Sequence, residues 1–220
     1  MNLEEHNRKY QYTNIDLLKE IYTTGKDILL ITGHYANWEW ISSLPKFIDY
    51  RVLAVYKTLH NRYFDKRFIR LRGKFGMIPV VKEKAFRTMI ECQKKKIPIT
   101  AYFVADQSPR WSEVRHWIPF LNQITPVLLG PEKTALKLNM VVVFLYIKKV
   151  RRGFYELTFI PLVMDPSDSK PYEITEKYYQ VLERIIREKP EDYLWTHDRW
   201  KHTRKYKQYM QASASKVQQQ

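Results

Sequence analysis

The chain has 220 residues, of which 45% are hydrophobic, so it is long enough to bury a full core in one domain. Its 38 lysines and arginines outnumber 23 aspartates and glutamates and give a formal net charge of +15. A charge of this size implies an anionic partner, although membrane lipid and nucleic acid are attracted by the same field. The single cysteine, Cys92, excludes an internal disulfide and fits a reducing compartment.

Helical and strand patterns alternate along the first half of the chain. A capping asparagine, Asn14, and a terminal glycine, Gly25, bound the first predicted helix. The predicted elements are a helix at 14–24, a strand at 27–32, a helix at 37–48, a strand at 52–56, a basic amphipathic helix at 61–75, a strand at 78–81, a helix at 85–95 and a strand at 98–104.

The second half begins with Thr125-Pro126, a cap followed by a proline suited to the first turn of a helix that we expect to run to Leu138. Further predicted elements are strands at 141–148 and 155–162, joined as a hairpin, a helix at 173–189 and a short helix at 191–195. This alternation predicts an α/β fold, a single-domain sandwich with a mixed, largely parallel sheet flanked by helices. We expect one domain over residues 1–210 and a disordered, low-complexity tail at 211–220.

A histidine follows the apolar strand predicted at 27–32. Gly33 allows a sharp turn there, and His34 then lies at the carboxyl end of the strand, where open α/β sheets bind their ligands. An imidazole titrates near about pH 6.5, and a neighbouring carboxylate can fix its tautomer and stabilise the imidazolium. The nearest carboxylate in sequence is Glu39. We therefore predict that His34 is a general base oriented by Glu39.

Two further segments offer candidate site residues. Asp106 and Gln107 follow the strand predicted at 98–104, where the carboxylate can orient His34, bind a polar substrate group such as a sugar, or brace the loop. If a helix begins near Gly130, its free amides and Lys133 make a site for phosphate or an oxyanion. A plain helix opening is the structural alternative for this segment.

The sequence has no HExxH, paired CxxC or clustered carboxylate motif, so no metal is expected. It also has no GxGxxG or Walker A loop, which argues against a nucleotide, and no cofactor is predicted.

Five sequence blocks, in order, resemble those of the bacterial lipid A late acyltransferases, within the lysophospholipid acyltransferase superfamily. The blocks are Gly33-His34-Tyr35-Ala36-Asn37-Trp38-Glu39-Trp40, Ala54-Val55-Tyr56-Lys57 with Asn61 and Asp65, Phe103-Val104-Ala105-Asp106-Gln107-Ser108-Pro109, Thr125-Pro126-Val127-Leu128-Leu129-Gly130-Pro131-Glu132-Lys133-Thr134-Ala135, and Tyr193-Leu194-Trp195-Thr196-His197-Asp198-Arg199-Trp200-Lys201. Lys57 stands where many members have arginine, which keeps the charge but loses the bidentate fork. The resemblance covers about residues 15–202.

The resemblance implies an O-acyltransferase that moves a fatty acyl chain from an acyl-acyl carrier protein or acyl-CoA thioester to a hydroxyl of an anionic membrane glycolipid. A lipid A precursor is the usual acceptor, while other members modify mannolipids or aminolipids. It makes His34 and Glu39 the catalytic residues. The substrate-binding residues that it implies are Asn37, Lys57, Asn61, Asp106, Gln107, Gly130 and Lys133, with Lys57 and Asn61 holding acceptor phosphate or sugar.

Members of this family usually begin with a transmembrane helix. The sequence has no run of about 18 apolar residues and no visible signal peptide, so we expect a chain without its N-terminal anchor. Its basic clusters would then hold it peripherally on the cytoplasmic face of the bacterial inner membrane.

Two other classes of protein share some of these features. A basic nucleic-acid- or membrane-binding protein without catalysis would have the same charge, but no recognised nucleic-acid-binding module is present, and no nucleic acid is expected. A catalytically inactive scaffold of the same fold would not need His34 and Glu39 together.

Overall fold

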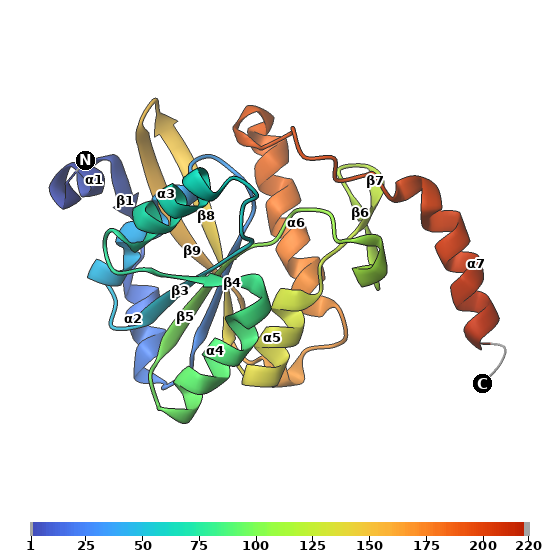
Figure 1. The fold of residues 1–220 in the computed structure, drawn as a ribbon, viewed down its shortest axis with the longest axis horizontal. Coiled ribbons are helices and arrows are strands. Elements are labelled where there is room, and N and C mark those ends of the chain that lie inside the picture. Colours follow the sequence, from blue (N-terminus) through green and yellow to red (C-terminus); the bar gives the residue numbers. More distant parts are fainter. Residues whose placement is uncertain (1, 218–220) are drawn as a thin grey trace.

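A computed structural model describes residues 2–217 of the chain. Within them a seven-stranded sheet forms the centre of the molecule, with helices on both faces (Figure 1). Its strands, in spatial order, are β1 (Tyr10–Tyr12), β9 (Phe154–Val163), β8 (Val141–Arg151), β2 (Ile28–Thr32), β5 (Ile99–Val104), β3 (Arg51–Tyr56) and β4 (Ile78–Val81). Only the β8–β9 pair is antiparallel among these neighbours. The predicted single-domain α/β class with a mixed, largely parallel sheet is confirmed.

The helices and a small second sheet complete the described part of the chain. The helices are α1 (Leu3–Lys9), α2 (Asp16–Thr23), α3 (Arg62–Gly73), α4 (Lys82–Lys94), α5 (Gly130–Leu138), α6 (Glu173–Glu188) and α7 (Tyr206–Val217). Short 3-10 helices lie at Trp38–Lys46 (η1), Trp111–Glu113 (η2), Pro166–Asp168 (η3), Pro190–Asp192 (η4) and Thr203–Lys205 (η5), and β6 (Trp117–Phe120) pairs with β7 (Gln123–Pro126).

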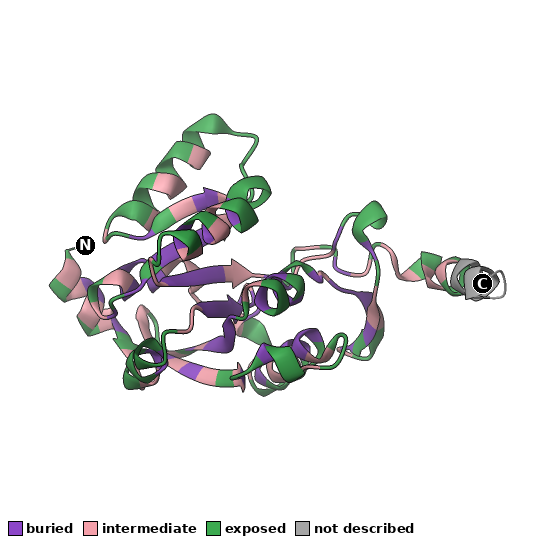
Figure 2. Ribbon diagram, turned by 90° about the horizontal axis from the view of Figure 1, so that it is seen from below, coloured by how far each residue is buried: buried purple, intermediate pink, exposed green. Residues whose placement is uncertain are grey.

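Strand β2 lies at the centre of the core, and all five of its residues are buried. Leu29 and Ile31 pack on one face with residues of α4, α5 and α6, whereas Ile28 and Leu30 pack on the other with residues of α2 and η1. Figure 2 shows the same layering, with buried strands between more exposed helices. Each fully buried side chain of this kind contributes about 1.5–3 kcal/mol, so β2 is a rigid base for the residues that follow it.

The segment after β2 differs from the helix predicted at 37–48. It is a 3-10 helix, η1, and it contains Pro45. Proline has no N–H to donate and disfavours the α conformation in the residue before it. Ala36, just before η1, also has a positive φ of 48°. The chain therefore turns more tightly here than an α-helix would.

Two predicted helix starts are also wrong. Asn14 does not cap α2; its side chain accepts from the N–H of Phe159 and donates to the carbonyl of Phe159 in β9. Thr125 and Pro126 belong to β7. The next proline, Pro131, stands in the first turn of α5.

The sequence did not predict α1, β1, the two strands of the β6–β7 hairpin or α7. Strand β1 adds a short parallel edge to β9. Helix α7 extends through Val217, so residues 211–217 of the predicted disordered tail are helical, and 218–220 lie outside the described residues. None of the helices in the described residues has both the length and the apolar composition needed to span a bilayer.

Candidate active site

The carboxyl ends of β2 and β5 bring together two residues that are far apart in sequence. Thr32 and Val104 are partners in the parallel β2–β5 pairing, and the chain reaches His34 and Asp106 two residues beyond each. Between Thr32 and His34, Gly33 fits closely under α6, because a Cβ added there would lie only 2.7 Å from the side chain of Leu182. This close packing fixes the position from which His34 leaves the sheet.

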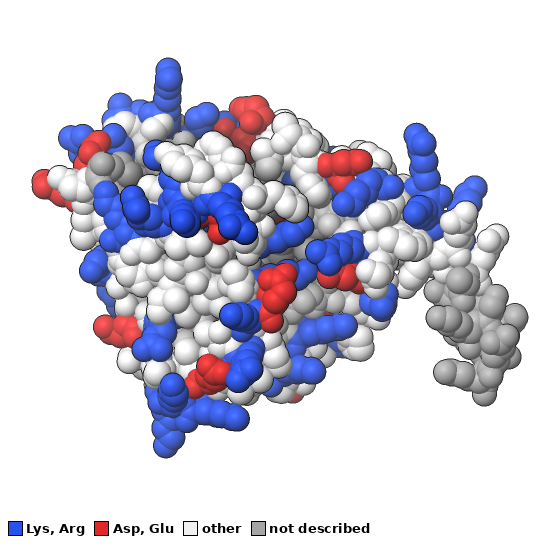
Figure 3. Space-filling model, viewed as in Figure 1, with Lys and Arg blue, Asp and Glu red and all other residues white. Residues whose placement is uncertain are grey.

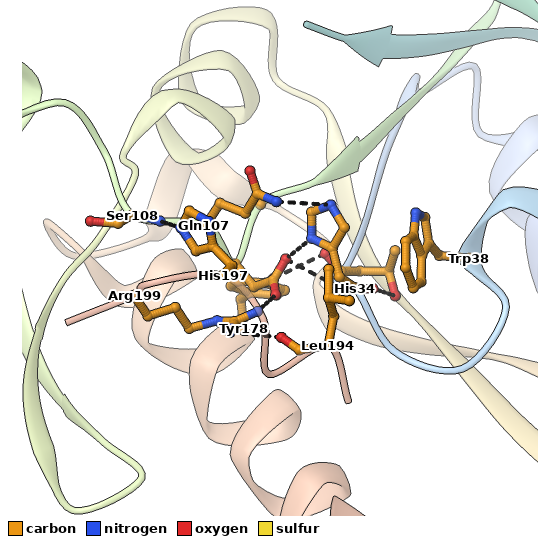
Figure 4. Close-up of polar contacts among 12 residues, drawn as sticks. His34, Trp38, Gln107, Ser108, Tyr178, Leu194, His197 and Arg199 are labelled. Atoms are coloured by element: carbon orange, nitrogen blue, oxygen red, sulfur yellow. Dashed lines mark hydrogen bonds and ion pairs between the residues drawn. The ribbon is translucent and has the colours of Figure 1, made fainter. Parts of the chain in front are cut away.

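His34 is held by Asp106. The Nδ1 atom of His34 lies 2.5 Å from Oδ1 of Asp106, and the backbone N–H of His34 donates to the same oxygen at 3.1 Å (Figure 4). The Asp106 side chain is fully buried, whereas the His34 side chain is 17% exposed. A buried carboxylate thus binds the Nδ1 side of an imidazole that is still partly exposed to solvent.

A buried arginine satisfies the other oxygen of Asp106. The guanidinium of Arg199 donates to Oδ2 at 2.6 Å and to the carbonyl of Leu194 at 2.9 Å, and it stacks 4.1 Å over the ring of Tyr193. Arginine matches such a position because its charge is permanent and its donors are fixed in a planar fork. The result is a continuous chain of charge-assisted contacts from Arg199 through Asp106 to His34.

The charges of Arg199 and Asp106 determine which ring nitrogen of His34 carries the hydrogen. Burial alone would raise the pKa of Asp106, but its contacts with His34 and Arg199 outweigh burial and hold that pKa well below its usual range. Asp106 is therefore ionised at neutral pH and can only accept hydrogen bonds. The Nδ1 atom of His34 must then carry the hydrogen, and Nε2 keeps the lone pair that can take a proton.

The backbone around His34 is fixed by the C-terminal part of the chain. Leu194 donates its N–H to the carbonyl of His34 at 3.0 Å, and Tyr193 forms a β-bridge with Tyr35. The hydroxyl of Tyr178, from α6, donates to the carbonyl of Thr32 at 2.9 Å. These contacts leave the imidazole little freedom to turn away from Asp106.

The free edge of the imidazole faces polar and aromatic neighbours. Nε2 of His34 lies 3.4 Å from the side-chain nitrogen of Gln107, and the Trp38 ring meets the imidazole edge-on with centroids 5.0 Å apart. Next to Gln107, the N–H of Ser108 donates to Nε2 of His197 at 2.9 Å. Burial, followed by the charge of Arg199, lowers the pKa of His197 and favours the neutral ring that accepts this bond. His197 therefore has a structural role in holding the loop that carries Asp106 and Gln107.

Glu39 does not make the contact with His34 that the sequence predicts. Both of its carboxylate oxygens accept from Arg72 of α3, at 2.5 and 2.9 Å. The positive φ of Ala36 and the 3-10 winding of η1 place Glu39 toward α3, while Asp106 comes to His34 from the adjacent strand. The carboxylate that orients His34 in this structure is Asp106.

The residues expected to bind the acceptor occupy different positions. Lys57 is exposed just after β3, at the same edge of the sheet as His34. Asn61 caps α3, with its side-chain oxygen accepting from the N–H groups of Tyr63 and Phe64. Asn37 is half-buried before η1, and its carbonyl accepts from the hydroxyl of Tyr10. The contacts of Asn61 and Asn37 are structural ones, and the binding roles of all three residues stay predictions.

The first turn of α5 lies against α6. Glu132, between Gly130 and Lys133 in this turn, accepts from the N–H groups of Tyr172 and Thr175 at the start of α6. Because α6 follows β9, which runs antiparallel to β8, this contact lies toward the opposite edge of the sheet from His34. The structure therefore shows no contact that brings Gly130 or Lys133 to His34 within residues 2–217.

Sequence reasoning assigned no role to Arg199, although it quoted the segment that contains it. Arginine is seldom fully buried, so the residue type alone does not mark this one as internal. The signal that could have found it is the dense aromatic composition of residues 193–200, which is typical of a buried segment rather than a polar tail. No group of three or more His, Cys, Asp or Glu side chains in the described part of the chain could hold a metal ion.

Comparison with known proteins identifies the family of the chain. A search among individual curated proteins gave no match. The family model of the bacterial lipid A biosynthesis acyltransferases matches residues 1–202, which include His34, Asp106 and Arg199. Since the match covers most of the 220 residues, the chain belongs to the bacterial lipid A biosynthesis acyltransferase family.

Proposed function

We propose that this acyltransferase uses His34 as the general base in transferring a fatty acyl chain from a thioester to a lipid hydroxyl. The observation that carries the proposal is the chain of contacts from Arg199 through Asp106 to Nδ1 of His34. It directs the basic Nε2 of His34 toward the exposed side of the imidazole. Such positioned proton transfer contributes about 10²- to 10⁴-fold to a reaction rate.

In the proposed reaction, Nε2 of His34 takes the proton of the acceptor hydroxyl as its oxygen attacks the thioester carbonyl. The tetrahedral intermediate collapses with cleavage of the carbon–sulfur bond, and the imidazolium returns the proton to the departing thiolate. The products are the acylated lipid and a free thiol. Asp106 stabilises the imidazolium that forms in between, and Arg199 keeps Asp106 ionised and in place. The reaction does not require a covalent acyl-enzyme.

Gln107 is the polar side chain best placed to meet the reactants. Its amide nitrogen lies 3.4 Å from Nε2 of His34, so in the proposed complex it donates to the acceptor oxygen or the developing oxyanion. Lys57, exposed at the same edge, binds an acidic group of the acceptor. The sequence predicted that Glu39 orients His34. In this proposal Glu39 instead holds α3 in place through its contact with Arg72.

The preferred substrates are an acyl-acyl carrier protein, or acyl-CoA, and an anionic glycolipid such as a lipid A precursor. The family supports a lipid A-type acceptor, and the net charge of +15 suits both an acidic carrier and an acidic lipid. Another glycolipid or an aminolipid is the alternative acceptor within the same chemistry. We place the enzyme peripherally on the cytoplasmic face of the bacterial inner membrane.

The test is thiol release from acyl carrier protein and CoA thioesters with candidate lipid acceptors, with the acylated product identified by mass spectrometry. Replacing the base in His34→Ala should abolish measurable transfer while circular dichroism stays that of the parent. His34→Gln, which keeps a similar shape without a basic nitrogen, should be equally inactive. Activity retained by either folded variant would refute the assignment of His34.

A further inference from the structure

Helix α3 is unlike the other long helices that cover the sheet, because none of its residues is buried. Three large apolar side chains stand out in water: Tyr63 is 69% exposed, Phe64 50% and Leu71 49%. Figure 2 shows the exposed and intermediate residues of this helix at the periphery of the molecule. Large apolar side chains that are exposed together on one helix, rather than scattered singly, are typical of an interaction site.

The exposed apolar residues share one face of α3. Tyr63, Arg67 and Leu71 follow at intervals of four, and Phe64 and Leu71 are seven residues apart, so all four lie along the same side. The inner side carries the half-buried Phe68, Ile69 and Arg72. The outer face thus mixes aromatic, aliphatic and cationic side chains.

The charge around this face is positive. Lys66, Arg67 and Arg70 are exposed on α3, and Figure 3 shows lysine and arginine side chains gathered over this helix. Tyrosine and phenylalanine beside cations are the composition of a helix that lies in the interface of a membrane, where apolar rings enter the headgroup layer and cations meet anionic lipid.

The position of α3 relates this face to the candidate active site. The helix begins six residues after β3 ends, at the same carboxyl edge of the sheet as His34. Its last turn contacts η1, where Arg72 holds Glu39 five residues after His34. A membrane bound to the outer face of α3 would therefore lie beside the site that acts on a membrane lipid.

We propose that the outer face of α3 is the surface by which this protein docks on an anionic bilayer. Tyr63, Phe64 and Leu71 enter the headgroup region, and the basic residues beside them contact anionic lipid headgroups. One part of this inference rests on the proposed function, namely that docking through α3 brings the His34 site to the lipid acceptor. Docking itself is a binding property and does not require catalysis.

The experiment is flotation of the full chain with vesicles of equal parts phosphatidylcholine and phosphatidylglycerol, and with pure phosphatidylcholine vesicles. The parent should bind the mixed vesicles more tightly and lose that preference at high salt. Phe64→Ser combined with Arg67→Gln should weaken binding by about tenfold or more, since it removes one inserted ring and one cation. The matched control is Met164→Ser combined with Lys170→Gln, which removes one exposed apolar and one exposed basic side chain beyond the end of β9, at the opposite edge of the sheet.

The control should bind like the parent. If the α3 variant bound equally well, or if the control weakened binding as much, the assignment of α3 would be wrong. Should the first variant lose its circular dichroism signal, Tyr63→Ser with Arg70→Gln tests the same face with different residues. If both α3 variants kept vesicle binding but lost binding to acyl carrier protein or to single-stranded RNA, α3 would serve another partner and the proposal would fail.

Acyl transfer to a detergent-dispersed acceptor separates this proposal from the proposed function. The α3 variants should keep that activity, because neither pair of residues contacts the His34 group. Loss of vesicle binding with retained transfer supports docking through α3. The opposite pattern is also informative. If vesicle binding depended on α3 but the His34→Ala variant still transferred acyl groups, docking would be upheld and the catalytic proposal would be refuted.

Discussion

Two carboxylate–arginine pairs in this molecule have similar chemistry and different surroundings. Asp106 and Arg199 are 0% and 1% exposed, and their pair ends on His34. Glu39 and Arg72 are 29% and 20% exposed, and their pair joins η1 to α3. The carboxylate that is nearer to His34 in sequence therefore braces a surface helix, and the more distant one orients the imidazole. Proximity along the chain is a poor guide to which acid serves a catalytic histidine.

The largest effect is expected from Asp106→Asn. An amide cannot stabilise the imidazolium and can present its NH2 group to Nδ1, which would favour the unproductive tautomer of His34. We expect kcat to fall about 10²- to 10⁴-fold. The buried guanidinium of Arg199 would also lose its counter-charge, which typically costs about 3–5 kcal/mol of unfolding free energy. Steady-state thioester kinetics and urea denaturation measure the two effects.

Partial denaturation is the alternative explanation for lost activity in that variant. His34→Gln provides the control, since it removes the base while leaving Asp106 and Arg199 paired. If Asp106→Asn kept parental kcat in a folded protein, the buried pair would not orient the catalytic base.

A smaller effect is expected from Arg199→Lys. Lysine keeps the positive charge beside Asp106 but cannot also reach the carbonyl of Leu194 with a second fixed donor. Leaving that partly buried acceptor without its partner should cost about 1 kcal/mol of unfolding free energy. Chemical denaturation measures the loss, and Arg199→Met should be more destabilising because it removes the charge as well. Equal stability of the lysine and methionine variants would contradict the role of the charge.

The smallest effect on catalysis is expected from Glu39→Gln. The pair with Arg72 is partly exposed, and pairs of this kind contribute about 0–1 kcal/mol. Transfer to a detergent-dispersed acceptor should stay within about tenfold of the parent, as measured by kcat alongside Asp106→Asn. A loss from Glu39→Gln as large as that from Asp106→Asn would break the contrast between the two pairs.

The pH dependence of stability should sharpen the same contrast. The pKa of Asp106 in the folded protein lies well below its ordinary value of 3.8. As the pH falls through about 4, the unfolded chain takes up a proton that the folded chain does not, so the stabilisation from Asp106 is complete above this pH and is lost below it. The difference in unfolding free energy between the parent and Asp106→Asn should therefore shrink as the pH falls below about 4. A difference that did not shrink between about pH 4 and pH 2 would show that Asp106 does not hold the depressed pKa.

The sequence predicts the fold where local pattern and tertiary packing agree. Ile28–Thr32 is a continuous apolar run and Glu173–Glu188 has a helical apolar periodicity, and both elements form close to the expected positions. The helix expected after Asn37 became a 3-10 helix, because Pro45 and the turn at Ala36 outweigh its helical composition. Asn14 and Thr125 have the chemistry of helix caps, but the Asn14 side chain bonds the backbone of Phe159 in β9. The Thr125 hydroxyl donates to the carbonyl of Gln123 and accepts from the indole N–H of Trp200.

The site likewise has a part that the sequence predicts and a part that it does not. His34 and Asp106 could be selected from the sequence because each follows an apolar strand, and parallel strands place such residues at one edge. Their pairing was one of three alternatives that the sequence left open, because choosing it depends on β2 and β5 being neighbours. The contact from Arg199 to Asp106 was not predicted, since it spans 93 residues of sequence. The direction of Glu39 depends on how the chain turns at Ala36, which the residue types between 34 and 39 do not determine.

The site is assembled from residues that are far apart in the sequence, and this constrains the order in which it forms during synthesis. A nascent polypeptide can complete every strand of the main sheet by residue 163 and still lack the guanidinium that arrives at residue 199. Until then Asp106 would have no buried counter-charge, and the backbone of His34 would lack its bond from Leu194. An intermediate that has not yet reached residue 199 would therefore have the strands of the main sheet without the competent imidazole, so that activity appears only after residue 199 has folded into place.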